Sequence, residues 1–562
     1  MPVEGTMSPL SLTWYPYLPD TGTLPNDDLD LQLVALHALE QRGIALTSSD
    51  IAAEWCEHVF FPWDEYGYAL TAMRLGFRPP FSGGFDNPFI HCMGAPIRSE
   101  IWAAVCAGRP AAAAAFAKCD AVVDHAGGEG MYGEMFLAAL EAAAFTCQDV
   151  PVLVADALRV IPDTCRVHKA VSLVSELYAK GVSLSEAREL VLSEQGSRNF
   201  THAAQNVAFT VAGLLWGEDF EDGLLKTVNL GYDTDCTAAT CGAVYGIFYG
   251  TAGIPAKWSA PIGTAVTVSA MVRGLDAPAD LDELTDRTLR IYDILSCVGE
   301  EELVLCAEGG DDYTVQTAVF PQGAARGKGL EVRLHYLDEP TLARDKTCPV
   351  SFTFINHTTG VWHMRLSVRG EGVQAAQREL RLEPGAAVDW YTHLMTDSPF
   401  ARLIPCDLCI ERLHDGSVWT RYHMPFTVLR PAHWFLNGAQ VAQAGTLVSF
   451  PEGAEDGVYV AQATLYCVKD RVTQIICACE SPFTVELDGK EILRSEGSDG
   501  WMPAYHRAPE DQKCACRLRW GRHVVRVTIR SDEPPQFGFA TTATADVSEP
   551  GEFYAYIDNY IE

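Results

Sequence analysis

The sequence predicts a multidomain protein in which a helical N-terminal region is followed by two β-sandwich domains. Apolar residues recur at helical spacing from residue 27 to about residue 296, as in Leu29, Leu33 and Leu36. After Cys306 short alternating segments are separated by turns, which is typical of strands. A further β unit begins after Arg430. We therefore expect domains at 1–300, 301–432 and 433–562.

The helical region contains several segments with clear start signals or a clear apolar face. In the segment 183–193, Ser183 stands three residues before Glu186, which resembles a capping box. The remaining helical patterns cover 49–55, 98–102, 110–118, 133–145 and 282–295.

The β regions show alternation and one strong turn signal. Residues 483–492 form a predicted hairpin around Asp488-Gly489, and 521–529 alternate cleanly. The last domain is similar in strand pattern to a jelly-roll of the galactose-binding type, with a turn-rich stretch that carries Trp501, Tyr505 and His506.

Composition and charge restrict the location and the partners. The 562-residue chain is 48% apolar, yet no apolar run approaches the roughly 20 residues that cross a bilayer. Its N-terminus lacks signal-peptide features, and its 18 cysteines show no framework spacing. The net charge of −33 argues against nucleic acid. We expect a cytoplasmic protein with reduced thiols, a small-molecule or glycan substrate, and no nucleic-acid or membrane partner.

Two acidic clusters, at 25–30 and 229–237, each come directly before a helical pattern. A carboxylate at a helix start is ordinarily a cap, so two unrelated caps are one interpretation. Carboxylates packed together repel, and a hard divalent cation relieves that repulsion. If the two helix starts meet, a two-metal site could form from Asp27, Asp28, Asp233 and Asp235. Asp30 could support that site or be solvated.

Two further motifs carry candidate chemistry. In 124–134, closely set glycines indicate a backbone that approaches a ligand or another helix, and His125 and Glu129 could titrate there. The alternative is a tight helix–loop junction. His202 and Asn206 lie one helical turn apart and could line a pocket or join helices through hydrogen bonds.

The cysteine pairs are better explained as core residues than as zinc ligands. Cys406 and Cys409 have zinc-knuckle spacing, but no second pair lies at a fitting distance. The other pairs are two residues apart on predicted strands and so share a face: Cys477 with Cys479, and Cys514 with Cys516.

Residues 229–235 and the small residues after them resemble the late signature of the ADP-ribosylglycohydrolase family. Asn26-Asp27-Asp28 resembles the early Thr-Asp-Asp element of that family. The stretches 124–133, 202–206 and 250–258 are similar to those of related bacterial members. The resemblance covers roughly residues 20–295 and does not extend to the β regions.

This resemblance implies an all-α orthogonal helical bundle with two Mg²⁺ or Mn²⁺ ions in a cleft, and hydrolysis of a ribosyl glycosidic bond. Carried over by position, the metal ligands would be Asn26, Asp27, Asp28, Asp233, Asp235 and Cys236. We predict catalytic roles for Asp28, Asp233 and Glu129. We predict substrate-binding roles for His125, Gly127, Gly128, Tyr132, His202 and Asn206.

The chain departs from the family pattern at three points. Asn26 and Cys236 each stand where the family usually has Thr. The glycine-rich first helix, often with an acidic residue, is missing, and residues 1–5 look like its tail. Either the chain starts late or this branch works without that helix.

We therefore predict a metal-dependent hydrolase that cleaves an N- or O-glycosidic bond of a ribosyl or related glycosyl substrate. One alternative is an inactive binding or structural protein on the same fold. Another is a glycan-directed glycosidase whose β domains set its specificity. Those domains could bind glycans, cover the cleft or build a homo-oligomer, and they favour a glycoside or nucleoside-like small substrate over protein de-ADP-ribosylation.

Overall fold

The computed structural model describes residues 23–61, 64–300, 303, 312–321, 329–397, 402–454, 456–498, 508–543 and 559–562. Residues 1–5 and the turn-rich stretch with Trp501, Tyr505 and His506 lie outside these ranges. Contacts within the chain divide it into two compact units, Met1–Phe60 with Phe89–Tyr313 and Phe61–Pro88 with Thr314–Glu562. The boundaries near 300 and 432 stay a prediction.

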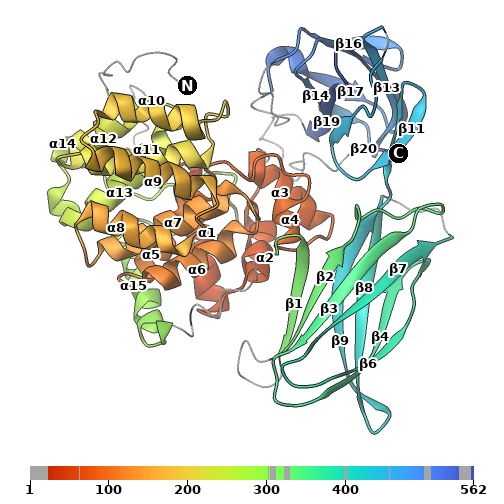
Figure 1. Cartoon of the computed structure of the whole chain (residues 1–562), viewed down its shortest axis with the longest axis horizontal. Helices are drawn as coiled ribbons and strands as arrows, with labels where there is room; N and C mark the ends of the chain where they lie inside the picture. Colours follow the sequence, from red (N-terminus) through yellow and green to blue (C-terminus); the bar gives the residue numbers. More distant parts are fainter. Residues whose placement is uncertain are drawn as a thin grey trace. The chain divides into compact units, whose positions relative to one another are not determined.

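The first unit is helical, as predicted (Figure 1). Among its elements, α11 packs against α7, α9, α12 and α13. The helices are α1 Asp27–Arg42, α2 Ser48–His58, α5 Ser99–Val105, α6 Pro110–Ala121, α7 Glu129–Ala144, α8 Val150–Ala157, α9 Arg166–Ala179, α10 Leu184–Gln195, α11 Ala203–Trp216, α12 Phe220–Asn229, α13 Thr234–Gly253, α14 Ala256–Ser259 and α15 Leu281–Ser296, with 3₁₀ turns at Pro96–Arg98 and Leu158–Val160.

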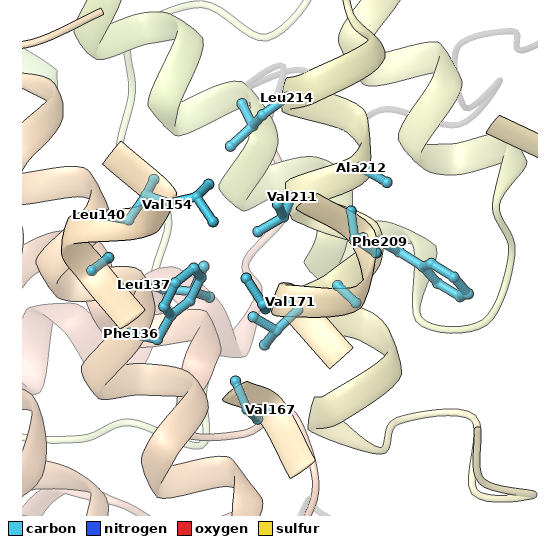
Figure 2. Close-up of a cluster of buried hydrophobic side chains, with 14 of the residues drawn as sticks. Phe136, Leu137, Leu140, Val154, Val167, Val171, Phe209, Val211, Ala212 and Leu214 are labelled. Atoms are coloured by element: carbon cyan, nitrogen blue, oxygen red, sulfur yellow. The ribbon is translucent and has the colours of Figure 1, made fainter. Parts of the chain in front are cut away.

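Apolar side chains of four helices form the core of this unit. Figure 2 shows Leu137 of α7, Val154 of α8, Val171 of α9 and Val211 of α11 pointing into the space between their helices. All four are at most 1% exposed. Burying an aliphatic side chain of this size contributes roughly 1.5–3 kcal/mol, so this core fixes how α7, α9 and α11 pack.

Several helix starts in this unit carry side-chain caps, and the sequence predicts the one at Ser183. Ser183 is the N-cap of α10, and its Oγ accepts the N–H of Glu186 at 3.3 Å. Asp219 and Asp280 cap α12 and α15 in the same way. Each cap satisfies a backbone donor that has no partner inside its helix, which fixes the residue where the helix begins.

The second unit contains α3 Asp64–Arg74, α4 Phe81–Gly84 and antiparallel sheets. Among the described residues, the first pair has strand orders β1-β2-β3-β7-β5 and β6-β4-β8-β9. Both sheets and α3 contribute to one apolar core, which includes Trp362, Phe352 and Leu75. The strands are β1 Val315–Pro321, β2 Gly329–Tyr336, β3 Cys348–Asn356, β4 Trp362–Gly370, β5 Val373–Gln374, β6 Arg378–Leu382, β7 Ala387–Thr396, β8 Leu403–His414 and β9 Ser417–Leu429.

A second pair of sheets follows, with its own core around Trp434, Tyr459 and Phe537. In the described ranges the orders are β11-β10-β13-β18-β15-β16, with β20 also on β13, and β12-β19-β14-β17. The strands are β10 Ala432–Leu436, β11 Ala439–Gln443, β12 Leu447–Ser449, β13 Val458–Cys467, β14 Arg471–Cys479, β15 Phe483–Leu487, β16 Lys490–Ser495, β17 Lys513–Leu518, β18 Gly521–Arg530, β19 Gln536–Ala543 and β20 Asn559–Ile561. The predicted order of a helical region and two β-sandwiches is confirmed.

The local β predictions also hold. The hairpin of β15 and β16 turns at Asp488 (φ 52°) and Gly489 (φ 78°), the left-handed pair that an Asp-Gly turn needs. Cys406 and Cys477 are buried in the two sandwich cores. No helix among the described residues has the length and apolarity needed to span a membrane.

Candidate active site

The N-terminus of α1 presents a group of carboxylates. Helix α1 starts at Asp27 because the Oδ1 of Asn26 accepts the N–H of Leu29 at 2.9 Å. Asp27, Asp28 and Asp30 occupy the first turn, where the helix dipole favours negative charge. Asp30 is buried and accepts the N–H of Ser269 at 3.1 Å and 3.3 Å with its two oxygens. It thus anchors α1 to the segment around residue 269.

The turn before α13 is held in an unusual backbone conformation. Gly231 (φ 78°) and Tyr232 (φ 67°) both adopt left-handed backbone, which a residue with a bulky side chain rarely does. The ring of Tyr232 lies 5.8 Å from that of Phe209 and has the Arg188 guanidinium 5.8 Å from its centroid. These contacts hold the turn in the conformation that directs the chain into Asp233.

The backbone of Asp233 is fixed from two sides. Its N–H donates to the Oδ1 of Asn206 in α11 at 3.1 Å, and its carbonyl accepts the Oγ1 hydroxyl of Thr237 at 3.0 Å. Asp233 is 5% exposed, whereas Asp235 in the first turn of α13 is exposed. The sequence predicted Asn206 as a substrate-binding residue, and the structure gives it a positioning contact with Asp233.

The two acidic clusters lie together in the structure. Burial, and then the charges of Asp27, Glu100 and Asp235, raise the pKa of Asp28 to about 8. The pKa of the Cys236 thiol is also raised, first by burial and then by four aspartates, namely Asp233, Asp28, Asp235 and Asp27. One potential ligand atom from each of Asp233, Asp235 and Cys236 lies within 4.8 Å of the others. The N-termini of α1 and α13 therefore form one acidic site.

Glu100 is a member of this site that the sequence did not single out. It lies in α5, where its Oε2 accepts the amide N–H of Gln32 at 3.0 Å and its Oε1 accepts the hydroxyl of Thr240 at 3.4 Å. Burial raises its pKa to about 7. Because Gln32 belongs to α1 and Thr240 to α13, Glu100 links the two helices that carry the aspartates. Its only signal in the sequence was a helical pattern at 98–102.

The donor set suits a hard divalent cation better than a soft one. Asp27, Asp28, Asp233 and Asp235 offer carboxylate oxygens, the donors that Mg²⁺ and Mn²⁺ prefer. The pKa of Asp28 is raised first by burial and then by neighbouring carboxylates, and a cation would relieve both effects. The amide oxygen of Asn26 already accepts a helix N–H, and the thiol of Cys236 is disfavoured as a thiolate. The four aspartates are thus the residues best fitted to hold metal.

His125 belongs to a buried ion network. The Arg98 guanidinium donates to both carboxylate oxygens of Asp124 at 2.6 Å and 3.0 Å and to Asp120 at 2.6 Å. The Nδ1 of His125 lies 2.8 Å from the Oδ1 of Asp124. Burial alone would raise the pKa of Asp124, but Arg98 and His125 outweigh it and the pKa is lowered. Arg98, Asp124 and His125 are at most 1% exposed, so these contacts join α6 to the α5 region.

The glycines of the 124–134 motif allow close approach of backbone. A Cβ on Gly128 would lie 1.9 Å from the carbonyl oxygen of Ile90, and one on Gly130 would lie 2.2 Å from the His125 ring. Gly127 has φ +75°, which favours glycine. The observed close contacts are those of a tight helix–loop junction, the alternative that the sequence left open.

Glu129 lies at the start of α7 and interacts with α9. Its two carboxylate oxygens accept the N–H groups of Arg166 and Val167 at 3.0 Å and 2.8 Å, which satisfies the first turn of α9. Tyr132, one turn later, is half-buried and packs against the core of the helical unit. The catalytic role predicted for Glu129 and the substrate role predicted for Tyr132 stay predictions.

His202 starts α11 within a basic cluster. Its Nε2 lies 3.0 Å from the Nη1 of Arg166, and its ring stacks on that of His91 at 5.7 Å. Burial, and then the charges of Arg166 and His91, lower the pKa of His202 to about 3. Its imidazole is therefore neutral at physiological pH. Asn206, one turn on, donates to the carbonyls of Phe200 and His202 in addition to accepting from Asp233.

Comparison with known proteins identifies the helical region. The family model of the ADP-ribosylglycohydrolases matches residues 1–293. The chain belongs to the ADP-ribosylglycohydrolase family. The predicted resemblance is confirmed, and the family acts as hydrolases of glycosidic bonds.

The individual relatives of this chain are distant. It is 28% identical over 118 residues to the ADP-ribosylarginine hydrolase Tri1 of Pseudomonas putida (strain GB-1), a match that covers 19% of this chain and 32% of that protein. The chain thus spans about a third of that curated relative. A solved ADP-ribosylglycohydrolase-related protein complex is 19% identical, with a TM-score of 0.30, over 48% of this chain and 81% of that one. An α-L-rhamnosidase of Streptomyces avermitilis is 12% identical, with a TM-score of 0.13, over 43% and 26% of the two chains.

Proposed function

We propose that this protein is a metal-dependent hydrolase of an N- or O-glycosidic bond, with two Mg²⁺ or Mn²⁺ ions held by Asp27, Asp28, Asp233 and Asp235. The convergence of these four carboxylates at two helix N-termini carries the proposal. Bound divalent ions would orient sugar hydroxyls and lower the pKa of a bound water.

The residues of the chain would prepare the site for that chemistry. Asn206 and Thr237 fix the backbone of Asp233, and so the point from which its side chain extends into the site. Asp28, with its pKa of about 8, loses its proton when a cation binds and would then stabilise the positive charge that develops on the ribose carbon. Glu100, held by Gln32 of α1 and Thr240 of α13, would keep the N-termini of these two helices close together.

The relative from Pseudomonas putida suggests the first substrate to test, the N-glycosidic bond of ADP-ribosylarginine. The two β-sandwiches favour a small glycoside or nucleoside-like substrate over an ADP-ribosylated protein. We further propose a cytoplasmic location for the protein, because the 18 cysteines of the chain show no framework spacing. It could assemble as a homo-oligomer through the sandwiches.

The test combines a metal titration with a substrate panel. Chelator-stripped protein is titrated calorimetrically with Mg²⁺ and Mn²⁺, beside Asp28→Asn and Asp235→Ala. It is then assayed with ADP-ribosylarginine, ADP-ribosylserine and nitrophenyl glycosides. We expect saturable binding and hydrolysis in the parent chain and the loss of both in the variants. Binding that persists in both variants would contradict the proposed ligands.

An inactive binding protein on the same fold is the second candidate, and two observations favour it. Asn26 uses its amide oxygen as a helix cap, and Cys236 supplies a poor donor for a hard cation. For this candidate we expect no saturable metal binding and no hydrolysis of any substrate in the panel, but retention of ADP-ribose itself in equilibrium dialysis.

A further inference from the structure

A second cluster of metal-ligating side chains lies at the corner between α1 and α2. His37 of α1 and Glu54 and His58 of α2 each place one potential ligand atom within 4.8 Å of the others. Glu54 is 2% exposed and His58 is 5% exposed. His37 lies nine residues after Asp28 on the same helix, roughly 13 Å along its axis at 1.5 Å per residue. The cluster is therefore separate from the aspartate site.

The hydrogen bonds of His58 direct one ring nitrogen at the carboxylate. Its Nδ1 lies 2.7 Å from the carbonyl oxygen of Arg273, so Nδ1 carries the proton and donates it. In the neutral ring, Nε2 then presents a lone pair, and it lies 3.5 Å from the Oε2 of Glu54. Two electron-rich atoms facing each other in a buried place repel, and a cation between them removes the repulsion. A carbonyl that fixes the far nitrogen is also how proteins orient metal-binding imidazoles.

The spacing of the three donors suits a tetrahedral ion. Bonds of 2.0–2.1 Å in tetrahedral geometry place ligand atoms roughly 3.3 Å apart. The Oε2 of Glu54 lies 3.5 Å from the Nε2 of His58 and 2.8 Å from the Nδ1 of His37. The second separation must widen by about half an ångström. The ligand atoms of the two histidines lie within 4.8 Å of each other. The His37 side chain is 14% exposed, which leaves access for a water as the fourth ligand.

The surrounding charges also favour a divalent cation. The Oε1 of Glu54 accepts the Nε–H of Arg42 at 2.9 Å. Asp50 and Glu57 lie close enough to Arg42 to raise its pKa, after the larger contribution of Glu54. Together with Glu54, these carboxylates outnumber the guanidinium of Arg42, so this corner carries an excess of negative charge that a cation would reduce.

We propose that His37, Glu54 and His58 form a binding site for a transition-metal ion of the zinc class, distinct from the Mg²⁺ or Mn²⁺ site of the four aspartates. Two imidazole nitrogens and one carboxylate oxygen are typical ligands of Zn²⁺ and Co²⁺. His37 binds through Nδ1 and carries its proton on Nε2. The bound ion joins α1 to α2, and through His58 it also holds Arg273 in the segment that follows α14.

Cobalt is the probe that tests this site. Chelator-stripped full-length protein is titrated with Co²⁺ in excess Mg²⁺ and followed by visible absorption. We expect one Co²⁺ per chain, with the d–d bands of nitrogen and oxygen ligands and without a thiolate charge-transfer band. Asp233→Asn should bind it as the parent does. His58→Ala should weaken binding at least roughly a hundredfold.

Two controls guard against misfolding and surface binding. His37→Gln keeps a donor for Glu54 and should fold as the parent does by circular dichroism, yet lose the cobalt bands. His414→Ala removes an exposed histidine that lies 3.4 Å from Asp415, and it should leave the titration unchanged. Zn²⁺ should raise the thermal midpoint of the parent and of His414→Ala but not that of His37→Gln. Three results would overturn the proposal: no cobalt binding in the parent chain, the presence of a thiolate charge-transfer band, or an unchanged titration in folded His37→Gln.

Discussion

Asp28 in the first turn of α1 and Asp235 in the first turn of α13 lie close enough for the charge of Asp235 to raise the pKa of Asp28. These residues are far apart in the sequence. Burial raises the pKa of Asp28 most, and the negative charges of Asp27, Glu100 and Asp235 raise it further. A site that keeps such repulsion in the free protein favours binding a cation over stability of the free state.

Asp28→Asn should stabilise the metal-free protein and abolish metal binding. The pKa of Asp28 is raised from 3.8 to about 8, so its ionisation opposes folding increasingly as the pH rises from about 4 to 8. At pH 8.5, after allowance for the partial exposure of the side chain, we expect a gain on the order of 1–3 kcal/mol in the free energy of unfolding. Urea unfolding in chelator measures it. The matched control is Asp286→Asn on the exposed face of α15, which should change little.

Glu100→Gln should shift the pH dependence of metal binding to lower pH. The charge of Glu100 helps to raise the pKa of Asp28, and a glutamine keeps the shape of the side chain without that charge. Asp28 then releases its proton more readily, so half-maximal Mn²⁺ binding should move down by about one pH unit. Calorimetric titrations between pH 5.5 and 8.5 check this. Glu194→Gln, on the exposed side of α10, serves as the control, and an equal shift there would refute a role for Glu100 in the site.

His202→Gln should reduce the loss of stability in acid. The pKa of His202 is lowered to about 3, while the unfolded imidazole takes up a proton near 6.5. The unfolded state therefore binds one more proton between these values, and the protein loses stability as the pH falls through that window, by up to about 1.4 kcal/mol per pH unit. In the variant, the difference in bound protons between the unfolded and folded states should fall by about one, so its stability should fall less steeply as the pH decreases. Denaturation between pH 4 and 7 measures it, and an unchanged slope would show that other groups cause the loss.

Local patterns in the sequence were enough to predict the start of α10 and the hairpin turn. The Ser183 cap and the Asp488-Gly489 turn depend on neighbours within a few residues, so the sequence contains the whole cause. At α1 the cap is Asn26, which the sequence predicted as a metal ligand. The order of a helical region and two sandwiches could likewise be predicted from the change in periodicity. These parts of the fold rest on short-range chemistry.

The remaining features depend on contacts between distant segments. Glu100 joins the site only because its side chain meets Gln32 of α1 and Thr240 of α13, and no pattern around residue 100 indicates those contacts. The cluster of His37, Glu54 and His58 is equally invisible, since two helices must meet before the side chains do. Likewise, residues 61–88 cluster with the strand-rich unit because Leu75 and Phe77 complete a sandwich core. Side chains that act through tertiary packing leave little signal in one sequence.

The glycines at the start of α7 give a last prediction, which separates packing from ligand binding. In Gly128→Ala the new methyl would lie 1.9 Å from the carbonyl oxygen of Ile90, so backbone must move, and we expect a loss of about 1–3 kcal/mol in the free energy of unfolding. Gly246→Ala in α13 is the matched substitution, because its methyl meets nothing within 4 Å and alanine favours helix, which should gain up to about 1 kcal/mol. Urea denaturation of both variants in chelator measures the difference. If Gly128→Ala instead kept full stability and lost only substrate affinity, Gly128 would be part of the substrate pocket and not of a helix–loop junction.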